Sequence, residues 1–280
     1  MNAGGIMIDI PQVITIASTD ASGGAGINAD LKTFHNQGVY AATIVVGLTA
    51  QNTYGVQDQY PIPAKFILEE FKSIADDLDI KAAKTGALLD EVRVHAVAQG
   101  WQSHNLGKLI IDPVMVAKGG SHLLSDTAID TLKTELIPLA FLITPNLPEA
   151  EILVGRSLKT DQDIIHAAMT IQNMGVKNVL IKGGHRADLK NEFADYILYA
   201  DGSSEWLTMP GIKTKRTHGT GDTLSSFITA NLAKGYDLKD IMPVAKKFTY
   251  EAIRQTINVG HGHGPLNHWV AITMGTEDNK

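Results

Sequence analysis

The feature that most constrains the fold is a regular alternation of short apolar runs with helical segments. Helical patterns, for example at 26–37 and 64–79, lead from one run to the next. A strand, a helix and a second strand in succession form a parallel βαβ unit. The alternation therefore predicts an α/β fold with a mainly parallel sheet. The runs occupy 12–18, 41–49, 82–85, 109–112, 141–144 and 178–182.

Two strand-like runs between 193 and 209 interrupt this alternation. They flank Asp201-Gly202, a dipeptide that favours a tight hairpin turn, and so predict an antiparallel pair. A helix that continues to about 234 and a longer one at about 238–259 follow.

The sequence Thr-His-Gly-Thr-Gly-Asp-Thr at 217–223 opens the first of these helices. Gly219 and Gly221 have no Cβ, so the backbone can turn sharply and direct N–H groups toward one point beside the positive end of the helix dipole. Asp222 within this anion site is expected to be ionised and able to take a proton from an alcohol. This combination predicts a phosphoryl-transfer enzyme, a small-molecule kinase. The alternative is that Asp222 only caps the helix.

Composition limits the class of protein. Of 280 residues, 44% are hydrophobic and 19% are charged, and the net charge of −6 gives no reason to expect nucleic-acid binding. The absence of cysteine excludes disulfides, thiolate zinc sites and a cysteine nucleophile. With no long apolar run or signal-peptide pattern, we expect no membrane contact and a cytoplasmic location. We expect one domain over 12–274, with loose tails at 1–11 and 275–280.

A second glycine-rich stretch, 24–29, suggests a different function. Gly-Ala-Gly-Ile-Asn-Ala fits the dinucleotide pattern G-x-G-x-x-[G/A] between a strand and a helix, which makes an NAD-dependent oxidoreductase a remote alternative. However, five residues separate Ser18 from Gly24, and no acidic residue that could hold a ribose lies between Lys32 and Asp58. The chain also lacks G-x-x-x-x-G-K-[S/T], which excludes a P-loop kinase.

Residues 218–222, His-Gly-Thr-Gly-Asp, resemble the anion-hole signature of the ribokinase-like kinases. Residues 19–34, 50–53 (Ala-Gln-Asn-Thr) and 142–150 (Leu-Ile-Thr-Pro-Asn-Leu-Pro-Glu-Ala) extend the resemblance, which runs from about 14 to about 268. Within that superfamily the chain is most similar to the hydroxymethylpyrimidine/phosphomethylpyrimidine kinases of thiamine biosynthesis. The resemblance implies a three-layer α/β/α sandwich with a mainly parallel central sheet. It also implies phosphorylation of 4-amino-5-hydroxymethyl-2-methylpyrimidine and its monophosphate with ATP and Mg²⁺. A homodimer stays an open alternative to a monomer.

The resemblance also assigns the catalytic residues and those that bind the nucleotide. Asp222 is the expected base, and developing charge is stabilised by the N–H groups of Gly219, Thr220 and Gly221. Lys182 ends an expected strand, from which its ammonium could reach a phosphate.

Asn146 and Glu149 lie three residues apart at the start of the helix after Pro145, so they share a face. The resemblance implies that they help to place Mg²⁺ and the nucleotide phosphates, with Glu149 as the metal residue. A carboxylate there could hold Mg²⁺ through water. The alternative is a first-turn Glu that stabilises the helix dipole.

Gln51 is the main candidate for contact with the acceptor. It leaves a buried strand at its C-terminal end, where parallel sheets bind ligands, and its amide can both donate to and accept from an aminopyrimidine edge. The alternative is an amide that caps a loop. The resemblance implies further acceptor contacts from Gly24, Asp30, Ala87 and Val114, although Asp30 could instead be a solvated helix residue.

Three positions depart from the family pattern. Asp222 stands where most relatives carry Cys, whereas pyridoxal kinases and ribokinase carry Asp. Ser18 replaces a usual Gly, and Ala87 replaces a Met that lines the pocket, so the apolar wall should be wider. A pyridoxal/pyridoxine kinase, alone or with the pyrimidine activity, therefore stays an alternative, as does a non-catalytic ligand-binding relative.

Overall fold

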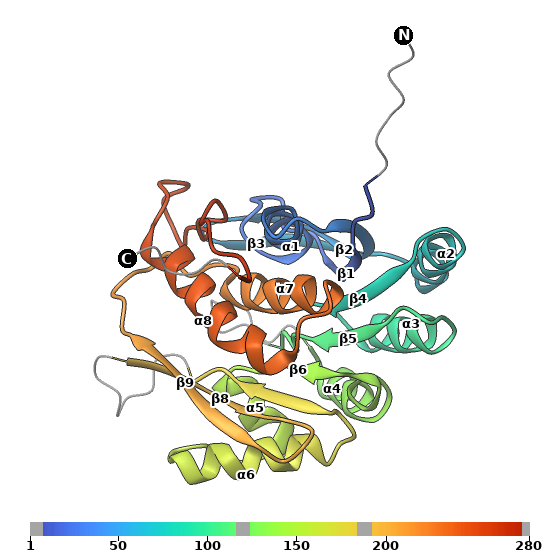
Figure 1. The fold of residues 1–280 in the computed structure, drawn as a ribbon. Helices are drawn as coiled ribbons and strands as arrows, with labels where there is room; N and C mark the ends of the chain where they lie inside the picture. The colour runs from blue at the N-terminus through green and yellow to red at the C-terminus, as the bar shows by residue number, and fades with distance from the viewer. Residues whose placement is uncertain (1–7, 116–123, 184–191, 276–280) are drawn as a thin grey trace.

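A single nine-stranded sheet forms the centre of the molecule (Figure 1). The computed structural model describes residues 8–115, 124–183 and 192–275. The strands are β1 (Gln12–Ser18), β2 (Tyr40–Asn52), β3 (Gly55–Pro61), β4 (Ile80–Thr85), β5 (Lys108–Ile111), β6 (Leu142–Ile143), β7 (Asn178–Ile181), β8 (Glu192–Leu198) and β9 (Ser204–Pro210). Their order is β3-β2-β1-β4-β5-β6-β7-β8-β9. Pairing is parallel from β2 through β1 to β7 and antiparallel at β3, β8 and β9, which confirms the predicted mainly parallel sheet and the hairpin.

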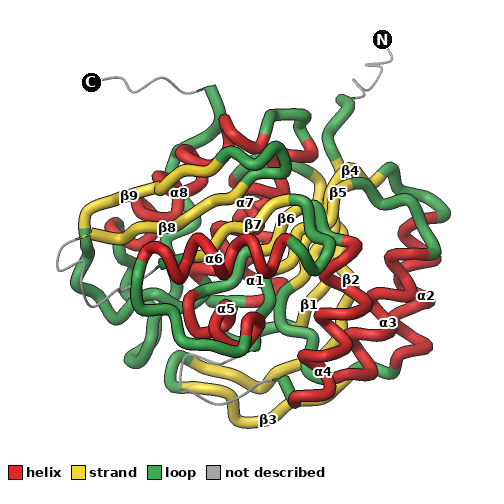
Figure 2. The backbone as a smooth tube through the Cα atoms, turned by 90° about the horizontal axis from the view of Figure 1, so that it is seen from below, coloured by secondary structure: helices red, strands yellow, loops and turns green. Residues whose placement is uncertain are grey.

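Helices cover both faces of the sheet. They are α1 (Gly26–Asn36), α2 (Ala64–Ala75), α3 (Glu91–Gln102), α4 (Asp126–Thr131), α5 (Leu147–Val154), α6 (Asp161–Gln172), α7 (Thr220–Ala233) and α8 (Leu238–Arg254). In Figure 1, α2, α3 and α4 are stacked on one side of the strands, and α7 and α8 lie on the other. Figure 2, seen from below, shows α2, α3 and α4 grouped in the same way. The described elements thus form the expected α/β/α sandwich.

The two largest clusters of the core are separated because successive strand residues point to opposite faces of the sheet. In β5, Leu109 and Ile111 belong to the cluster that includes α2, α3 and α6, whereas Ile110 belongs to the cluster of α7 and α8. In β7, Val179 and Leu180 are divided in the same way. The central strands are therefore buried on both faces, which is why they read as continuous apolar runs.

One strand is not predicted by the sequence pattern. β3 pairs antiparallel with β2, and all of its residues are exposed except the half-buried Gly55. Polar residues such as Gln57, Asp58 and Gln59 give it no apolar alternation. Pairing with β3 carries β2 to Asn52, past the predicted end at 49.

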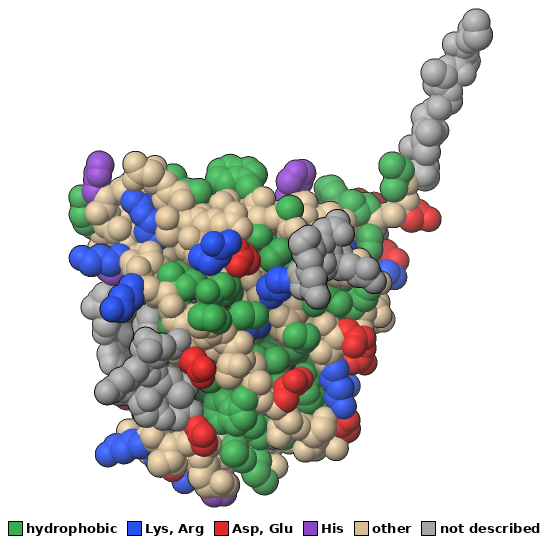
Figure 3. All heavy atoms as spheres, turned by 60° about the vertical axis from the view of Figure 1, so that its left-hand side comes forward, with side chains coloured by type: hydrophobic (Ala, Val, Ile, Leu, Met, Phe, Trp, Pro, Cys, Tyr) green, Lys and Arg blue, Asp and Glu red, His purple; other side chains and the backbone are tan. Residues whose placement is uncertain are grey.

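The tails predicted at 1–11 and 275–280 lie mostly outside the described residues, which include only 8–11 and Gly275 of them. Within the described ranges, no helix combines the length and the apolar character that crossing a bilayer requires. On the face drawn in Figure 3, basic and acidic side chains are interspersed with hydrophobic ones.

Candidate active site

A cavity of about 350 Å³ lies at the carboxyl ends of the parallel strands. The residues that follow β1, β4, β5, β6 and β7, the end of β2 and the loop before α7 all contribute to its wall. This is the edge at which open parallel sheets bind ligands. Every predicted site residue except Gly24 and Asp30 lines it: Gln51, Ala87, Val114, Asn146, Glu149, Lys182, Gly219, Thr220, Gly221 and Asp222.

The loop before α7 and the first residues of that helix (217–221), called the anion loop below, have the geometry of an anion site. Gly219 is the N-cap residue, with φ of 83°, and a Cβ there would lie 2.0 Å from the carbonyl oxygen of Gly24, so no other residue fits. A Cβ at Gly221 would lie 2.7 Å from a carboxylate oxygen of Asp112 and 3.1 Å from Lys182 Nζ. The N–H groups of a helix's first turn have no partner within the helix. The loop therefore presents such groups, beside the Lys182 ammonium, to the cavity.

Asp222 is in the first turn of α7 and is almost completely buried, with 9% of its surface exposed. Its Oδ1 lies 3.1 Å from Lys84 Nζ, and the backbone N–H of Gly26, at the start of α1, also donates to it. Burial alone would raise the pKa of Asp222, but Lys84 and the Gly26 amide hold that pKa below its usual value. The carboxylate is therefore ionised and faces the cavity, as a general base requires.

Lys84 is fully buried and was not among the predicted site residues. Its Nζ contacts Asp30 Oδ1 at 2.8 Å in addition to Asp222. Asp30 also accepts hydrogen bonds from Thr15 Oγ1 at 2.6 Å and Ser226 Oγ at 2.7 Å. Burial raises the pKa of Asp30 to about 6, against the lowering effect of Lys84. Asp30 is fully buried, so the alternative interpretation as a solvated helix residue is wrong. Asp30 also does not line the cavity, so this geometry does not support its predicted contact with the acceptor.

A second charged cluster consists of Lys182, Asp112 and Glu149, with the polar residue Asn146 beside Glu149. Lys182 Nζ lies 2.7 Å from Asp112 Oδ1. Asn146 and Glu149 form a capping box at the start of α5, in which each side chain accepts from the other residue's backbone N–H, at 2.9 and 2.8 Å. Burial raises the pKa of Glu149 to about 7, against the lowering effect of Lys182. Glu149 therefore stabilises the start of α5, as the alternative interpretation of a first-turn Glu expected, and it also lines the cavity.

Gln51 lies near the C-terminal end of β2, as predicted, and its Nε2 is 3.0 Å from Nε2 of His218. The same nitrogen of His218 lies 2.8 Å from Oδ2 of Asp20. Asp20 also accepts from the backbone N–H groups of Gly24 and Ala25, at 3.1 and 2.9 Å. The amides that a dinucleotide pyrophosphate would need are thus occupied by Asp20, which argues against the oxidoreductase alternative.

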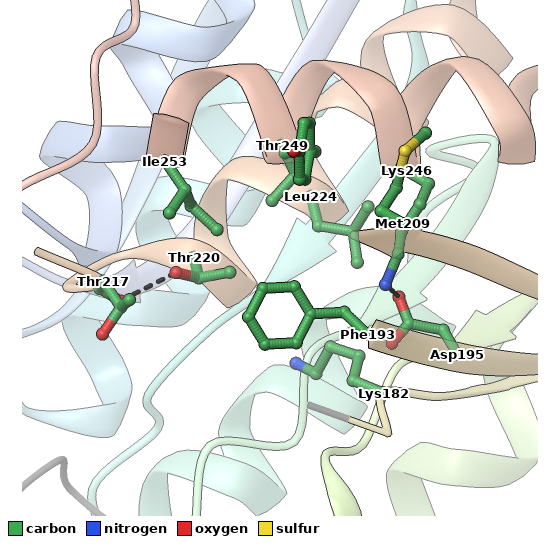
Figure 4. A pocket seen from close by; sticks show the side chains of 11 residues that line it. Lys182, Phe193, Asp195, Met209, Thr217, Thr220, Leu224, Lys246, Thr249 and Ile253 are labelled. Carbon is green, nitrogen blue, oxygen red and sulfur yellow. Dashed lines mark hydrogen bonds and ion pairs between the residues drawn. The ribbon is translucent and has the colours of Figure 1, made fainter. Parts of the chain in front are cut away.

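A smaller cavity of about 250 Å³ adjoins the first and shares Lys182, Thr217 and Thr220 with it (Figure 4). Its wall is mostly apolar and comes from β8, β9, α7 and α8, including Phe193, Met209, Leu224, Tyr250 and Ile253. Figure 4 shows the Phe193 ring between Lys182 and Leu224, with the Lys246–Asp195 ion pair at one end. The Thr249 hydroxyl in this wall is buried and has no hydrogen-bond partner among the residues that the structure describes.

Several of these residues were missed from the sequence, and some had a usable signal. Lys84 is a charged residue within an apolar run, and Asp112 ends another, so both were visible as exceptions in buried strands. Asp20 and His218 stand within the stretches that resemble the family. Apart from Lys182, Thr217 and Thr220, the residues of the smaller cavity have no local signal, because four separate elements bring them together.

The comparisons with known proteins agree with this geometry. A family model described as phosphomethylpyrimidine kinase matches residues 20–267. The hydroxymethylpyrimidine/phosphomethylpyrimidine kinase of Haemophilus influenzae is 45% identical over 264 residues, which cover 94% of this chain and 98% of that protein.

Two solved structures share the fold. The ADP complex of Bacillus subtilis pyridoxal kinase has a TM-score of 0.85 and 37% identity, and the match covers 93% of this chain and 98% of that one. The phosphomethylpyrimidine kinase of Clostridium difficile has a TM-score of 0.76 and 35% identity over 86% of this chain and 99% of that one. With the family model matching most of its length, the chain belongs to the phosphomethylpyrimidine kinase family.

Proposed function

We propose that this chain transfers the γ-phosphoryl group of ATP to 4-amino-5-hydroxymethyl-2-methylpyrimidine and then to the resulting monophosphate. The observation that carries the proposal is Asp222, an ionised carboxylate that faces the cavity from the first turn of α7, beside the anion loop. The names of the relatives supply the acceptor and its phosphate.

In the proposed arrangement, each of the two cavities holds one substrate. The acceptor lies in the larger one, with its amino group and ring nitrogen at Gln51 and its ring against Ala87 and Val114. The nucleobase lies in the smaller, mostly apolar one. The phosphates then cross the shared wall, where Lys182 and the amides at the start of α7 lie. The ADP complex of the Bacillus subtilis relative supports nucleotide binding by this fold.

Glu149 is the residue expected to hold Mg²⁺. Its carboxylate accepts backbone N–H groups and is 2% exposed, so coordination through water fits better than a direct cage. Among the described residues, no group of three or more His, Cys, Asp or Glu could hold a metal. Magnesium needs few protein ligands when phosphates supply the others, so the donor set fits the ion. When bound, Mg²⁺ would neutralise phosphate charge.

In the first reaction, Asp222 removes the hydroxyl proton of the acceptor. The acceptor oxygen forms a bond to the γ-phosphorus, and the bond from that phosphorus to the β–γ bridging oxygen breaks, which releases ADP. Lys182 and the N–H groups of the anion loop stabilise the charge that develops on the transferring group. Asp222 returns the proton to solvent after the product leaves.

In the second reaction, the attacking atom is a phosphate oxygen of the monophosphate. A phosphate monoester loses its second proton near pH 6, so this oxygen is already anionic at neutral pH. The second transfer therefore needs the anion loop and Lys182 but no general base.

Pyridoxal is the second candidate acceptor, and two observations favour it. Ala87 in the cavity wall leaves room that a Met would fill, and the Bacillus subtilis pyridoxal kinase has a TM-score of 0.85 with this chain. Pyridoxal lacks the amine that Gln51 would bind. We expect activity on pyridoxal to be measurable but lower.

The test is ADP formation with ATP and each acceptor in turn: the hydroxymethylpyrimidine, its monophosphate and pyridoxal. The proposal expects turnover with the first two, and kcat/KM for the pyrimidine above that for pyridoxal. No ADP with any acceptor would indicate a non-catalytic relative, and a preference for pyridoxal would make pyridoxal kinase the leading function.

A further inference from the structure

Three charged side chains form a chain of ion pairs that runs from the cavity into the core. Lys84 Nζ lies 2.8 Å from Asp30 and 3.1 Å from Asp222. The side chains of Lys84 and Asp30 are 0% exposed, whereas that of Asp222 is 12% exposed and lines the cavity. One lysine is therefore shared by a carboxylate that faces the substrates and a carboxylate that does not.

The charge of this trio explains why the second carboxylate matters. With all three groups ionised, the charges −1, +1 and −1 sum to −1, and after Asp222 takes a proton they sum to zero. If Asp222 were the lysine's only partner, protonation would leave an unpaired ammonium in the interior, which is strongly unfavourable. With Asp30 present, Lys84 keeps a partner at 2.8 Å throughout.

We propose that Asp30 and Lys84 are positioning residues that set the basicity of Asp222. Lys84 keeps Asp222 ionised between turnovers, and Asp30 balances Lys84 while Asp222 holds the proton of the acceptor. The inference rests on the proposed function, in which Asp222 is the general base.

The hydrogen bonds of Asp30 fit this role. Its carboxylate accepts from Thr15 and Ser226 as well as from Lys84, so its anionic form has three donors. Burial nevertheless raises the pKa of Asp30 to about 6, so the anion predominates at neutral pH but is lost as the pH falls below that value.

The other charged groups near Asp222 have partners of their own. Lys182 is paired with Asp112 at 2.7 Å, and His218 with Asp20 at 2.8 Å. His268 Nε2 lies 3.0 Å from the Thr223 hydroxyl. Lys84 is thus the cation that holds Asp222 by direct contact. Asp222 interacts electrostatically with Lys84, Asp30, Lys182, His218 and His268.

The experiment compares the two acceptors across pH in the full-length protein. The variants are Asp30→Asn, Lys84→Met, the double variant and the milder Thr15→Val, which removes one hydrogen bond from Asp30. The monophosphate reaction needs no base, so it serves as an internal control for folding and nucleotide binding in each variant. We measure kcat and KM for ATP with both acceptors from about pH 3.5 to pH 9, because the pKa of Asp222 lies below its usual value and the wild-type acid limb therefore lies below pH 5.

With the hydroxymethyl acceptor, Asp30→Asn should lower the plateau kcat by roughly tenfold or more, because protonated Asp222 would leave Lys84 unpaired. Lys84→Met should move the acid limb of the profile to higher pH, by about 1–3 units, because Asp222 loses its cation. Thr15→Val weakens the Asp30 anion, so it should act like a milder Asp30→Asn and lower the plateau kcat by less than that variant does. The double variant should be faster than Asp30→Asn, because no ammonium is left unpaired. The monophosphate reaction should change little in all four.

Two sets of results would overturn the inference. If Asp222→Asn loses the hydroxymethyl reaction while Asp30→Asn, Lys84→Met and Thr15→Val keep the wild-type plateau and acid limb, the tuning role fails and the proposed base stands. If Asp222→Asn keeps full activity, the base and its tuning fail together. Equal losses with both acceptors would show that the trio only supports the fold, which also overturns the inference. Thr15→Val keeps the test decisive if a charge-removing variant does not fold.

Discussion

The two cavities that meet at Lys182, Thr217 and Thr220 are built differently. The larger is lined by carboxylates, an ammonium and backbone amides held in fixed pairs. The wall of the smaller exposes mostly apolar surface, from side chains such as Phe193, with one ion pair at its end. Fixed charges lower the energy of a transition state in which charge moves, whereas an apolar wall holds a flat group by burial. Substitutions in the larger cavity should therefore change rate, and those in the smaller should change affinity.

The largest effect should come from Asp222→Asn. With the hydroxymethyl acceptor we expect kcat to fall by roughly 10²–10⁴, the usual contribution of a general base, with little change in substrate binding because the side chains are nearly isosteric. With the monophosphate acceptor kcat should stay within a few-fold of wild type. Steady-state kinetics with both acceptors measures the difference.

The matched control is Asp201→Asn, which changes an exposed surface carboxylate that pairs with Lys239. It should leave both rates unchanged. A near wild-type kcat for Asp222→Asn, under conditions where chemistry is rate-limiting, would mean that Asp222 only stabilises the first turn of α7, whose N-cap is Gly219, and is not the general base.

Lys182→Met and Glu149→Gln should have the next largest effect. Because these groups are placed to balance phosphate and magnesium charge, kcat/KM for ATP should fall by about 10²–10³ while acceptor binding stays intact. Calorimetric titration measures acceptor binding, and kinetics with varied ATP measures the change in kcat/KM for ATP. Lys65→Met, at an exposed lysine on α2, is the control. Loss of acceptor affinity with unchanged ATP kinetics would reverse the assignment of the two cavities.

Gln51→Leu tests specificity within the larger cavity. The variant keeps similar bulk but removes the amide that pairs with the amino group and ring nitrogen of the pyrimidine. Each lost pairing leaves a buried group unpaired at about 1–3 kcal/mol, so the preference for pyrimidine over pyridoxal should shrink by about 5- to 150-fold. The readout is kcat/KM for both acceptors. An unchanged ratio would remove Gln51 from acceptor recognition.

The smallest effect is expected in the smaller cavity. Phe193→Ala should raise KM for ATP by about 2- to 12-fold, since an aromatic contact contributes about 0.5–1.5 kcal/mol, and should leave kcat unchanged. Thr249→Val keeps the shape of the wall and removes its unpaired hydroxyl, so it should leave KM for ATP unchanged. A large rise in KM for Thr249→Val would show that this hydroxyl hydrogen-bonds the nucleotide and that the cavity is not simply apolar.

The features that could be predicted from the sequence are those that a local pattern of residues determines. The parallel strands were predicted because burial on both faces makes them continuous apolar runs, and the anion loop because Gly219 and Gly221 stand at a helix start. β3 was missed because its exposed, polar residues carry no such pattern.

The pairing of Lys84 could not be predicted because it joins residues far apart in the chain. Its partners Asp30 and Asp222 lie 54 and 138 positions away, and nothing near Lys84 indicates either of them. The same holds for the smaller cavity, in which β8, β9, α7 and α8 each contribute only a part. Asp30 was assigned to the acceptor by the resemblance alone, whereas in the structure its side chain is fully buried and contacts Lys84.

Lys182, Thr217 and Thr220 belong to both walls, so a substrate bound in either cavity contacts residues that also line the other. The two binding equilibria are then linked by a coupling free energy. Thermodynamic reciprocity requires that any factor by which nucleotide changes acceptor affinity equals the factor by which acceptor changes nucleotide affinity. Two titrations, each with and without the other ligand in a non-reacting form, must therefore give the same number, and that number measures how strongly the shared wall couples the two halves of the site.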